Sequence, residues 1–225
     1  MSENLTVTLL LTLKVASIAT LVVFIPGTLL GFYFERKESR LVRILSAITI
    51  LPMVIPPTAV GFMLLKLFGY DGILGGWLTS MDIDVLLTWK AAVIASSVMA
   101  FPIMVRTAKV AFEGVDSKLE EMARTLGYGP VQTFFKVALP LSFRGLMAAA
   151  ILSFTRAVGE FGATVTVAGN IHGKTQTLSS AIYSAQEVGN QQEVTVLIII
   201  SLLLGFFAIF MTEMLSRKSS KYLRS

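Results

Sequence analysis

Residues 119–142 read LEEMARTLGYGPVQTFFKVALPLS and form a charged interruption between two strongly apolar stretches of the chain. The spacing of apolar and charged residues predicts an amphipathic helix over 115–126. Gly127 is expected to break this helix, and the stretch that follows is predicted to stop at Pro140. Because acidic and basic residues alternate along the helix, docking onto a soluble protein is favoured over binding to anionic lipid.

Outward from this loop, the chain consists of apolar stretches that are long enough to cross a bilayer. A helix of about 20 apolar residues spans the hydrocarbon core. Only 15% of the 225 residues are charged, whereas soluble domains carry about a quarter. The sequence therefore predicts an all-α polytopic membrane protein, a single domain over 1–225 with a cytoplasmic loop at about 113–142. The five predicted spans are about 5–34, 44–68, 86–112, 143–168 and 194–215.

Lysine and arginine fall on alternate sides of these spans. The loop 69–85 has no basic residue, whereas 14 of the 19 basic residues flank the first span, the loop 113–142 or the last span. Those residues are Arg36, Lys37, Arg40, Arg43, Arg106, Lys109, Lys118, Arg124, Lys136, Arg144, Arg217, Lys218, Lys221 and Arg224. The positive-inside rule then predicts that the N-terminus lies outside and that the C-terminus lies in the cytoplasm.

The composition excludes several classes of function. With no cysteine and His172 as the single histidine, thiolate and histidine metal clusters are excluded. An enzyme would need a nucleophile, acid–base or metal constellation, so we predict no catalytic residue and no metal ligand. The net charge of +5 is explained by the membrane-flanking loops, and no nucleic-acid partner is predicted.

The second span contains LPMVIPP, residues 51–57, with prolines at Pro52, Pro56 and Pro57. Each proline removes a backbone donor, which costs about 3 kcal/mol in a soluble helix interior. In a membrane, such breaks persist only where protein or a water-filled cavity satisfies the freed carbonyl groups. Two interpretations remain open at this point, namely a packing kink and a bent helix that lines a pathway or gate.

The loop resembles the cytoplasmic signature of ABC importer permeases. The positions that carry this resemblance, at the family's spacing, are Glu121, Ala123, Gly127, Val137, Leu139 and Pro140. Met122 stands where that family usually has alanine. The stretches LPMVIPPTAVGF (51–62) and RAVGEFGATVTVAGNIHGKTQTLSSAIY (156–183) resemble the molybdate and tungstate branch, and sulfate permeases are the nearest competing branch.

The resemblance implies a type I importer permease that works as a homodimer in the cell membrane of a prokaryote. It also implies two cytoplasmic ATP-binding subunits, which would hold ATP and magnesium, and an external molybdate- or tungstate-binding protein. This chain would hold no cofactor. The residues expected to couple it to the ATPase are Glu120, Glu121, Ala123, Arg124, Gly127, Leu139 and Pro140. A self-powered channel or secondary transporter is the alternative, and it would work without ATPase subunits.

Arg156 and Glu160 lie four residues apart in the fourth span, on one helical face. A lone arginine in the bilayer costs about 2.5–3.5 kcal/mol on insertion scales, so an ion pair is expected. This pair either is structural, at the subunit interface, or lies near the path, where Arg156 would meet an oxyanion. Further candidates for the path are the hydroxyl groups of Ser153, Thr155, Thr164 and Thr166. Residues 175–192 are too polar to span, and we expect a short helix on the outer face.

Overall fold

The computed structural model describes the backbone of residues 2–220 and the side chains of residues 5–214. The described chain is helical throughout its regular structure and contains no strand. In chain order, its helices are α1 (Ser2–Arg36), α2 (Arg40–Val54), α3 (Pro57–Phe68), α4 (Gly75–Thr79), α5 (Trp89–Glu113), α6 (Ser117–Thr125), α7 (Pro130–Thr133), the π-helical turn η1 (Phe134–Ala138), α8 (Leu139–Val158), α9 (Gly162–Ala168), α10 (Leu178–Glu187) and α11 (Gln191–Ser220).

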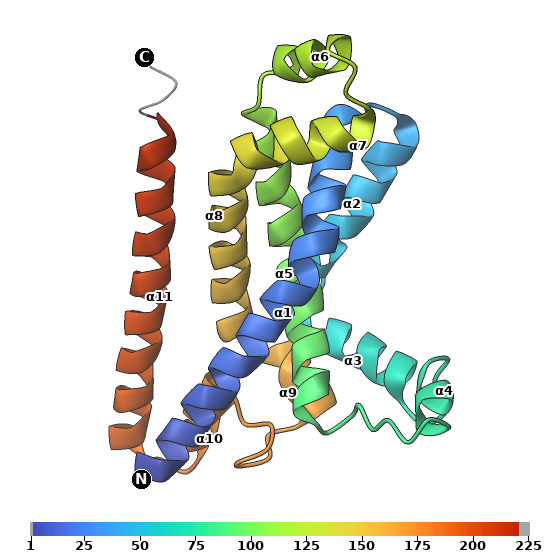
Figure 1. Ribbon diagram of the computed structural model, residues 1–225. Helices are drawn as coiled ribbons and strands as arrows, with labels where there is room; N and C mark the ends of the chain where they lie inside the picture. The colour runs from blue at the N-terminus through green and yellow to red at the C-terminus, as the bar shows by residue number, and fades with distance from the viewer. Residues whose placement is uncertain (1, 221–225) are drawn as a thin grey trace.

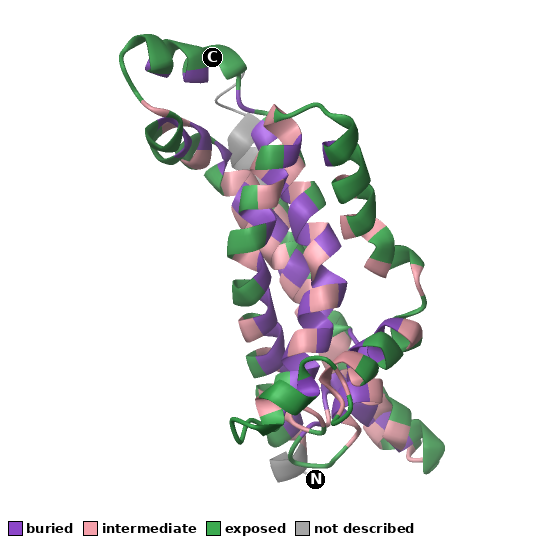
Figure 2. Ribbon diagram, turned by 90° about the vertical axis from the view of Figure 1, so that its right-hand side faces the viewer, coloured by how far each residue is buried: buried purple, intermediate pink, exposed green. Residues whose placement is uncertain are grey.

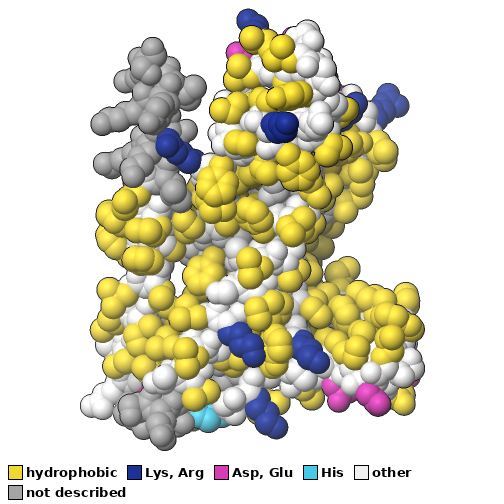
Figure 3. Space-filling model, in the orientation of Figure 1, with side chains coloured by type: hydrophobic (Ala, Val, Ile, Leu, Met, Phe, Trp, Pro, Cys, Tyr) yellow, Lys and Arg dark blue, Asp and Glu magenta, His cyan; other side chains and the backbone are white. Residues whose placement is uncertain are grey.

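Four helical stretches of the described chain are long and apolar enough to cross a membrane, and the bent pair α2–α3 would make a fifth crossing. These stretches are Leu5–Arg36, Trp89–Glu113, Pro130–Val158 and Gln191–Met214. The prediction of an all-helical polytopic membrane protein is therefore confirmed. Figure 3 shows the corresponding surface, on which hydrophobic side chains cover most of the height of the molecule between its two ends.

Different short helices lie at the two ends of the bundle. Helices α6 and α7 lie at one end, beside the last turn of α1 and the first turn of α2, whereas α4, α9 and α10 lie toward the opposite end (Figure 1). The basic loop after α1 and the basic loop around α6 thus share one end, as the charge pattern predicts. The predicted basic cluster at Arg217, Lys218, Lys221 and Arg224 lies outside the described side chains.

Helices α1 and α5 form the most extensive helix pair of the bundle, and small residues allow their close approach. A Cβ atom added at Gly27 would lie 2.5 Å from Met104 Cγ. One added at Gly31 would lie 2.7 Å from Ala108 Cβ and 2.9 Å from the backbone nitrogen of Lys109. Glycines one turn apart let two membrane helices pack backbone to backbone. This Gly27–Gly31 contact was not predicted from the sequence.

We expect Gly31→Val to destabilise the α1–α5 pair, because the atoms that its side chain would meet include backbone that cannot swing aside. Overpacking of this kind costs about 1–3 kcal/mol. The matched control is Gly205→Val in α11, where a Cβ atom would meet nothing within 4 Å. The thermal midpoint of the purified protein in detergent measures the effect, and equal midpoints for the two variants would contradict the packing argument.

The proline-rich part of the second predicted span is a sharp bend. Helices α2 and α3 meet at 108°, and the Ile55 N–H donates to Leu51 O at 3.1 Å as the last bond of α2. Pro56 follows, and Pro57 occupies the first turn of α3, where a missing N–H has no cost. Residues 44–68 thus belong to two separate helices, and the angle between them is larger than a kink within one continuous helix.

The helix that contains Pro140 does not stop there, so the predicted end at this residue is wrong. The chain is helical from Pro130 to Val158. A π-helical turn precedes the proline, and the Leu139 N–H donates to Phe134 O, five residues back. The wider turn accommodates a residue that lacks a backbone donor.

The predicted fourth span, 143–168, is interrupted. Helix α8 ends at Val158, and α9 begins at Gly162. Between them, Glu160 Oε1 accepts a hydrogen bond from the Ala163 N–H at 2.8 Å, so this carboxylate satisfies a free donor in the first turn of α9. The predicted short helix within 175–192 is confirmed as α10.

The α8–α9 break packs against the α2–α3 break. A Cβ atom added at Gly162 would lie 2.9 Å from Pro57 Cβ, and one added at Gly61 would lie 2.6 Å from Thr166 Cβ. Helices α3 and α9 therefore approach each other closely through glycine. Two interrupted helices meet at one place in the bundle.

Candidate functional site

Helix α6 is a short helix with well-formed ends at the tip of the bundle. Its first turn is capped by Asp116, whose carboxylate accepts the Lys118 N–H at 3.0 Å. The helix ends at Thr125, and Gly127, two residues later, has φ +89°. The Tyr128 N–H donates to Ala123 O at 3.1 Å. This is the glycine-terminated arrangement in which a left-handed residue ends a helix, and it explains why glycine suits position 127.

The two faces of α6 are different. Ala123 and Glu120 are buried against the rest of the protein, whereas Glu121, Arg124 and Met122 are exposed, the last by 61%. Figure 2 shows this helix projecting from the end of the bundle with most of its residues exposed. An exposed helix face that mixes charged and large apolar side chains has the composition of a surface that docks onto another protein.

The structure separates the predicted coupling residues into three groups. Those that are exposed are Glu121, Arg124, Gly127 and Pro140. Leu139 is half-buried, and Ala123 and Glu120 are buried. The side chain of Glu120 is only 4% exposed, so it is turned away from the surface on which a partner would dock.

Glu120 instead binds Arg36, the last residue of α1. Arg36 Nε and Nη2 both donate to Glu120 Oε1, at 3.0 and 2.7 Å. Arg36 Nη2 also lies 3.3 Å from Phe112 O and 3.2 Å from Val115 O, to which it donates. In the sequence, Arg36 is one of several basic residues after the first span. No local signal marks it as the partner of a glutamate that lies 84 residues later.

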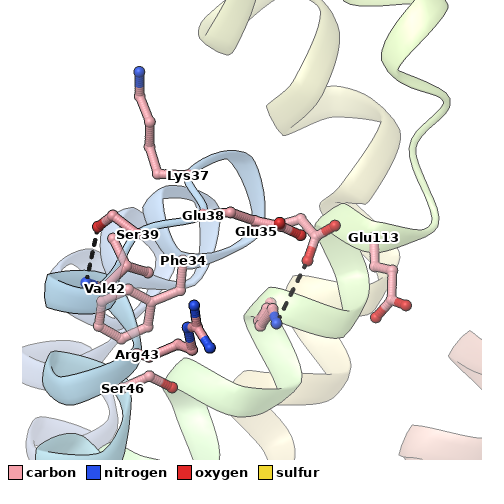
Figure 4. Close-up of a pocket in the computed structure, with 10 residues that line it drawn as sticks. Phe34, Glu35, Lys37, Glu38, Ser39, Val42, Arg43, Ser46 and Glu113 are labelled. Carbon is pink, nitrogen blue, oxygen red and sulfur yellow. Dashed lines mark hydrogen bonds and ion pairs between the residues drawn. The ribbon is translucent and has the colours of Figure 1, made fainter.

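A charged cavity lies beside this contact, between the end of α1, the start of α2 and the end of α5 (Figure 4). It has a volume of about 680 Å³. Its lining residues are Phe34, Glu35, Lys37, Glu38, Ser39, Val42, Arg43, Ser46, Lys109 and Glu113. Glu35 Oε2 and Lys109 Nζ are 3.8 Å apart and form an ion pair across the cavity wall. The sequence did not predict this cavity.

The predicted ion pair between Arg156 and Glu160 is confirmed. Arg156 Nη1 and Glu160 Oε2 are 2.7 Å apart, and their side chains are 28% and 1% exposed. Glu160 uses its other oxygen on the Ala163 N–H, so both of its oxygens are occupied. The guanidinium group carries five N–H donors and remains partly exposed beside the paired helix breaks, where an anion could approach it.

The four predicted hydroxyl groups are not equivalent. Ser153, Thr155 and Thr166 each donate to a carbonyl group of their own helix four residues back, at 2.8, 2.9 and 2.8 Å. Ser153 is fully buried. Thr164 Oγ1 is buried and has no hydrogen-bond partner, so among the four it is the hydroxyl group with unused capacity.

The three predicted prolines lie along the bend of the second span. Pro56 and Pro57 are exposed, and Pro52 is half-buried. Pro52 lines an apolar groove of about 350 Å³ between α1, α2 and α5. Within the described residues, no group of three or more His, Cys, Asp or Glu side chains is arranged to hold a metal ion.

Comparison with known proteins agrees with this architecture. Residues 27–221 match the family described as binding-protein-dependent transport system inner membrane component. The chain is 40% identical over 212 residues to the molybdenum transport system permease protein ModB of Escherichia coli K12, covering 93% of each chain. It is 41% identical over 204 residues to the putative molybdenum transport system permease protein YvgM of Bacillus subtilis, covering 88% of this chain and 89% of that one.

Solved structures share the fold at lower identity. The inward-facing MetNI methionine ABC transporter matches with a TM-score of 0.73 at 22% identity, covering 97% of this chain and 99% of that one. A bacterial ABC transporter for the import of alginate matches with a TM-score of 0.74 at 18% identity, covering 96% and 80%. The family match covers most of this chain, and two relatives are at least 40% identical to it over nearly their whole length. The chain therefore belongs to the family of inner membrane components of binding-protein-dependent transport systems.

Proposed function

We propose that this chain is the permease of an ATP-driven importer that carries molybdate, tungstate or both across the cell membrane by alternating access. It would work as a homodimer with two cytoplasmic ATPase subunits and an external binding protein. The observation that carries the proposal is the exposed face of α6, a short helix with well-formed ends on which Glu121, Met122 and Arg124 are exposed. The substrate is supported by relatives whose names state molybdenum transport.

The proposed topology has five crossings, with the N-terminus outside and the C-terminus in the cytoplasm. The basic residues that flank α6 and follow α1 support a cytoplasmic position for that end of the bundle. The aspartates between α3 and α5 (Asp71, Asp82 and Asp84) fall at the opposite end. In this arrangement the loop 113–142 faces the ATPase, and α10 faces the binding protein.

We propose that the transport path follows the two helix breaks. Interrupted helices line substrate sites in other membrane transporters, because their ends offer backbone groups at membrane depth. Arg156 would meet the oxyanion in one conformation while Glu160 keeps it oriented, with Pro56, Pro57 and Thr164 at the same junction. Pro52, Thr155 and Thr166 would border the path, and Ser153 would support it from inside the bundle. Binding there should be weak enough to allow release.

Uptake of labelled molybdate into proteoliposomes tests the proposal. The permease is reconstituted with the ATPase subunits and the binding protein of its own system, with ATP on the cytoplasmic side. We expect uptake that requires ATP and all three components, and that excess tungstate inhibits more strongly than excess sulfate. Uptake by the permease alone would indicate a channel or secondary transporter, and stronger inhibition by sulfate would indicate a sulfate permease.

Single-cysteine labelling tests the topology in the same system, because the chain has no cysteine of its own. We expect Lys118→Cys, in α6, to react with a membrane-impermeant maleimide only after the cells are opened. Gln186→Cys, in α10, should react in intact cells. Labelling of Lys118→Cys in intact cells would overturn the proposed orientation and the docking role of α6 together.

A further inference from the structure

We infer that Arg36 is a positioning residue for coupling: it locks α6 to α1 and α5 so that movement of α6 is transmitted to these two helices. The inference rests on the proposed function, since it concerns how the chain receives force from the ATPase. It adds a residue and a route that neither the sequence pattern nor the family membership identifies.

The Arg36 guanidinium group joins three segments at one point. It holds the carboxylate of Glu120 in α6 through two hydrogen bonds. It also donates to Phe112 O, in the last turn of α5, and to Val115 O, in the link between α5 and α6. Phe112 O already accepts the Val115 N–H at 3.0 Å. A carbonyl oxygen has two lone pairs, so Arg36 adds a second hydrogen bond to it, and the guanidinium group contacts several acceptors together. A lysine has one nitrogen and would lose the second hydrogen bond to Glu120, which Arg36 makes through Nε.

The burial of Glu120 makes this contact specific. An ionised carboxylate that is 4% exposed is costly to bury unless it is paired and hydrogen-bonded. Pairing with Arg36 therefore fixes which face of α6 turns inward, and it leaves Glu121 on the outward face. The two adjacent glutamates have different roles: Glu120 anchors the helix, and Glu121 is free to meet a partner.

The residue before Arg36 makes a second contact between α1 and its neighbours. Glu35 pairs with Lys109 of α5 at 3.8 Å, so the last turn of α1 is tied to α5 by one residue and to α6 by the next. Farther along the same helices, Gly31 packs against Ala108 and Lys109. The end of α1, the end of α5 and α6 thus form one connected block.

Helix α2 is less firmly attached to this block. Val42 is the only buried residue of α2, and it packs with Phe34 of α1 and Val105 of α5. The 680 Å³ cavity lies beside this contact, between the first turns of α2 and the ends of α1 and α5 (Figure 4). A displacement of α6 would therefore carry α1 and α5 directly, while α2 follows them through this one buried residue. The bend between α2 and α3 lies at the far end of that same helix, beside the proposed path.

The experiment compares Arg36→Gln with wild type in proteoliposomes that contain the complete transporter, and it measures molybdate transported per ATP hydrolysed. We expect this ratio to fall by about tenfold, within the range seen when residues of a coupling network are changed, while ATP hydrolysis continues. The double exchange Arg36→Glu with Glu120→Arg should recover part of the ratio. Arg36→Lys should restore the ratio only in part, because lysine has no counterpart of the Nε donor that Arg36 also places on Glu120.

Arg40→Gln is the matched control, since Arg40 is exposed and lies only four residues later. If Arg36 served folding alone, Arg36→Gln would reduce the amount of protein in the membrane, or would reduce the rates of transport and ATP hydrolysis by the same factor. The ratio of molybdate transported to ATP hydrolysed would then be unchanged, and that result would overturn the inference. Hydrogen exchange of the α6 amides gives a readout that does not depend on the substrate. We expect faster exchange in Arg36→Gln than in Arg40→Gln, and equal exchange would also overturn it. Failure of wild-type molybdate uptake would instead count against the proposed function.

Discussion

Arg156→Ala is expected to destabilise the protein by about 3–5 kcal/mol, the cost of removing one partner from a buried ion pair. The carboxylate of Glu160, 1% exposed, would lose its 2.7 Å partner and keep only the Ala163 N–H. The double variant Arg156→Ala with Glu160→Ala removes both charges and is expected to be more stable than the single one. The measurement is the denaturation midpoint of the purified permease in detergent.

The double-variant cycle separates the pair from its surroundings. Glu160→Gln is the matched companion, because it keeps the shape of the side chain and an oxygen for the Ala163 N–H while it removes the charge. If the losses in Arg156→Ala and Glu160→Ala simply add in the double variant, the two groups are not coupled, and the pairing argument fails. Arg156→Lys then tests the path: it keeps a cation near Glu160, and a loss of molybdate uptake with an unchanged midpoint would indicate contact with the anion.

The features that are local in sequence could be predicted. The length of an apolar stretch and the charge of its flanks directly reflect how a chain meets a bilayer, and α6 carries its own start and stop signals at Asp116 and Gly127. The Arg156–Glu160 pair was also accessible, because a spacing of four residues places two side chains on one helical face.

The features that the sequence did not predict depend on contacts between distant segments or on an unusual backbone. Pro140 reads as a stop signal, but the preceding π-helical turn lets the helix pass through it. The break after Val158 is supported by a glutamate that caps the next helix and by a glycine that meets another helix. Arg36 and Glu120 are 84 residues apart, and only the packing of α1 against α5 brings them together.

Glu121→Arg is expected to abolish ATP-driven uptake while the protein remains in the membrane. Glu121 is exposed on the outward face of α6, and reversing its charge places a cation where the proposed ATPase surface meets an acid. Residues at the centre of a protein interface contribute about 2 kcal/mol or more when they are removed, and like charges brought together add repulsion. Because the side chain of Glu121 is exposed and makes no hydrogen bond or ion pair with another of the described residues, its replacement should leave the permease fold intact.

The matched control for Glu121→Arg is Glu187→Arg, which makes the same charge reversal at an exposed residue at the opposite end of the molecule. Co-purification of the ATPase subunits with each variant is the direct measurement, and molybdate uptake in proteoliposomes is the functional one. We expect Glu121→Arg to lose both and Glu187→Arg to retain the ATPase subunits. Because Arg36 binds the buried Glu120 and Glu121 is exposed, we assign the loss in Glu121→Arg to the docking surface and not to the Arg36 contact. Retention of the ATPase subunits and of full uptake in Glu121→Arg would mean that α6 meets its partner through another face.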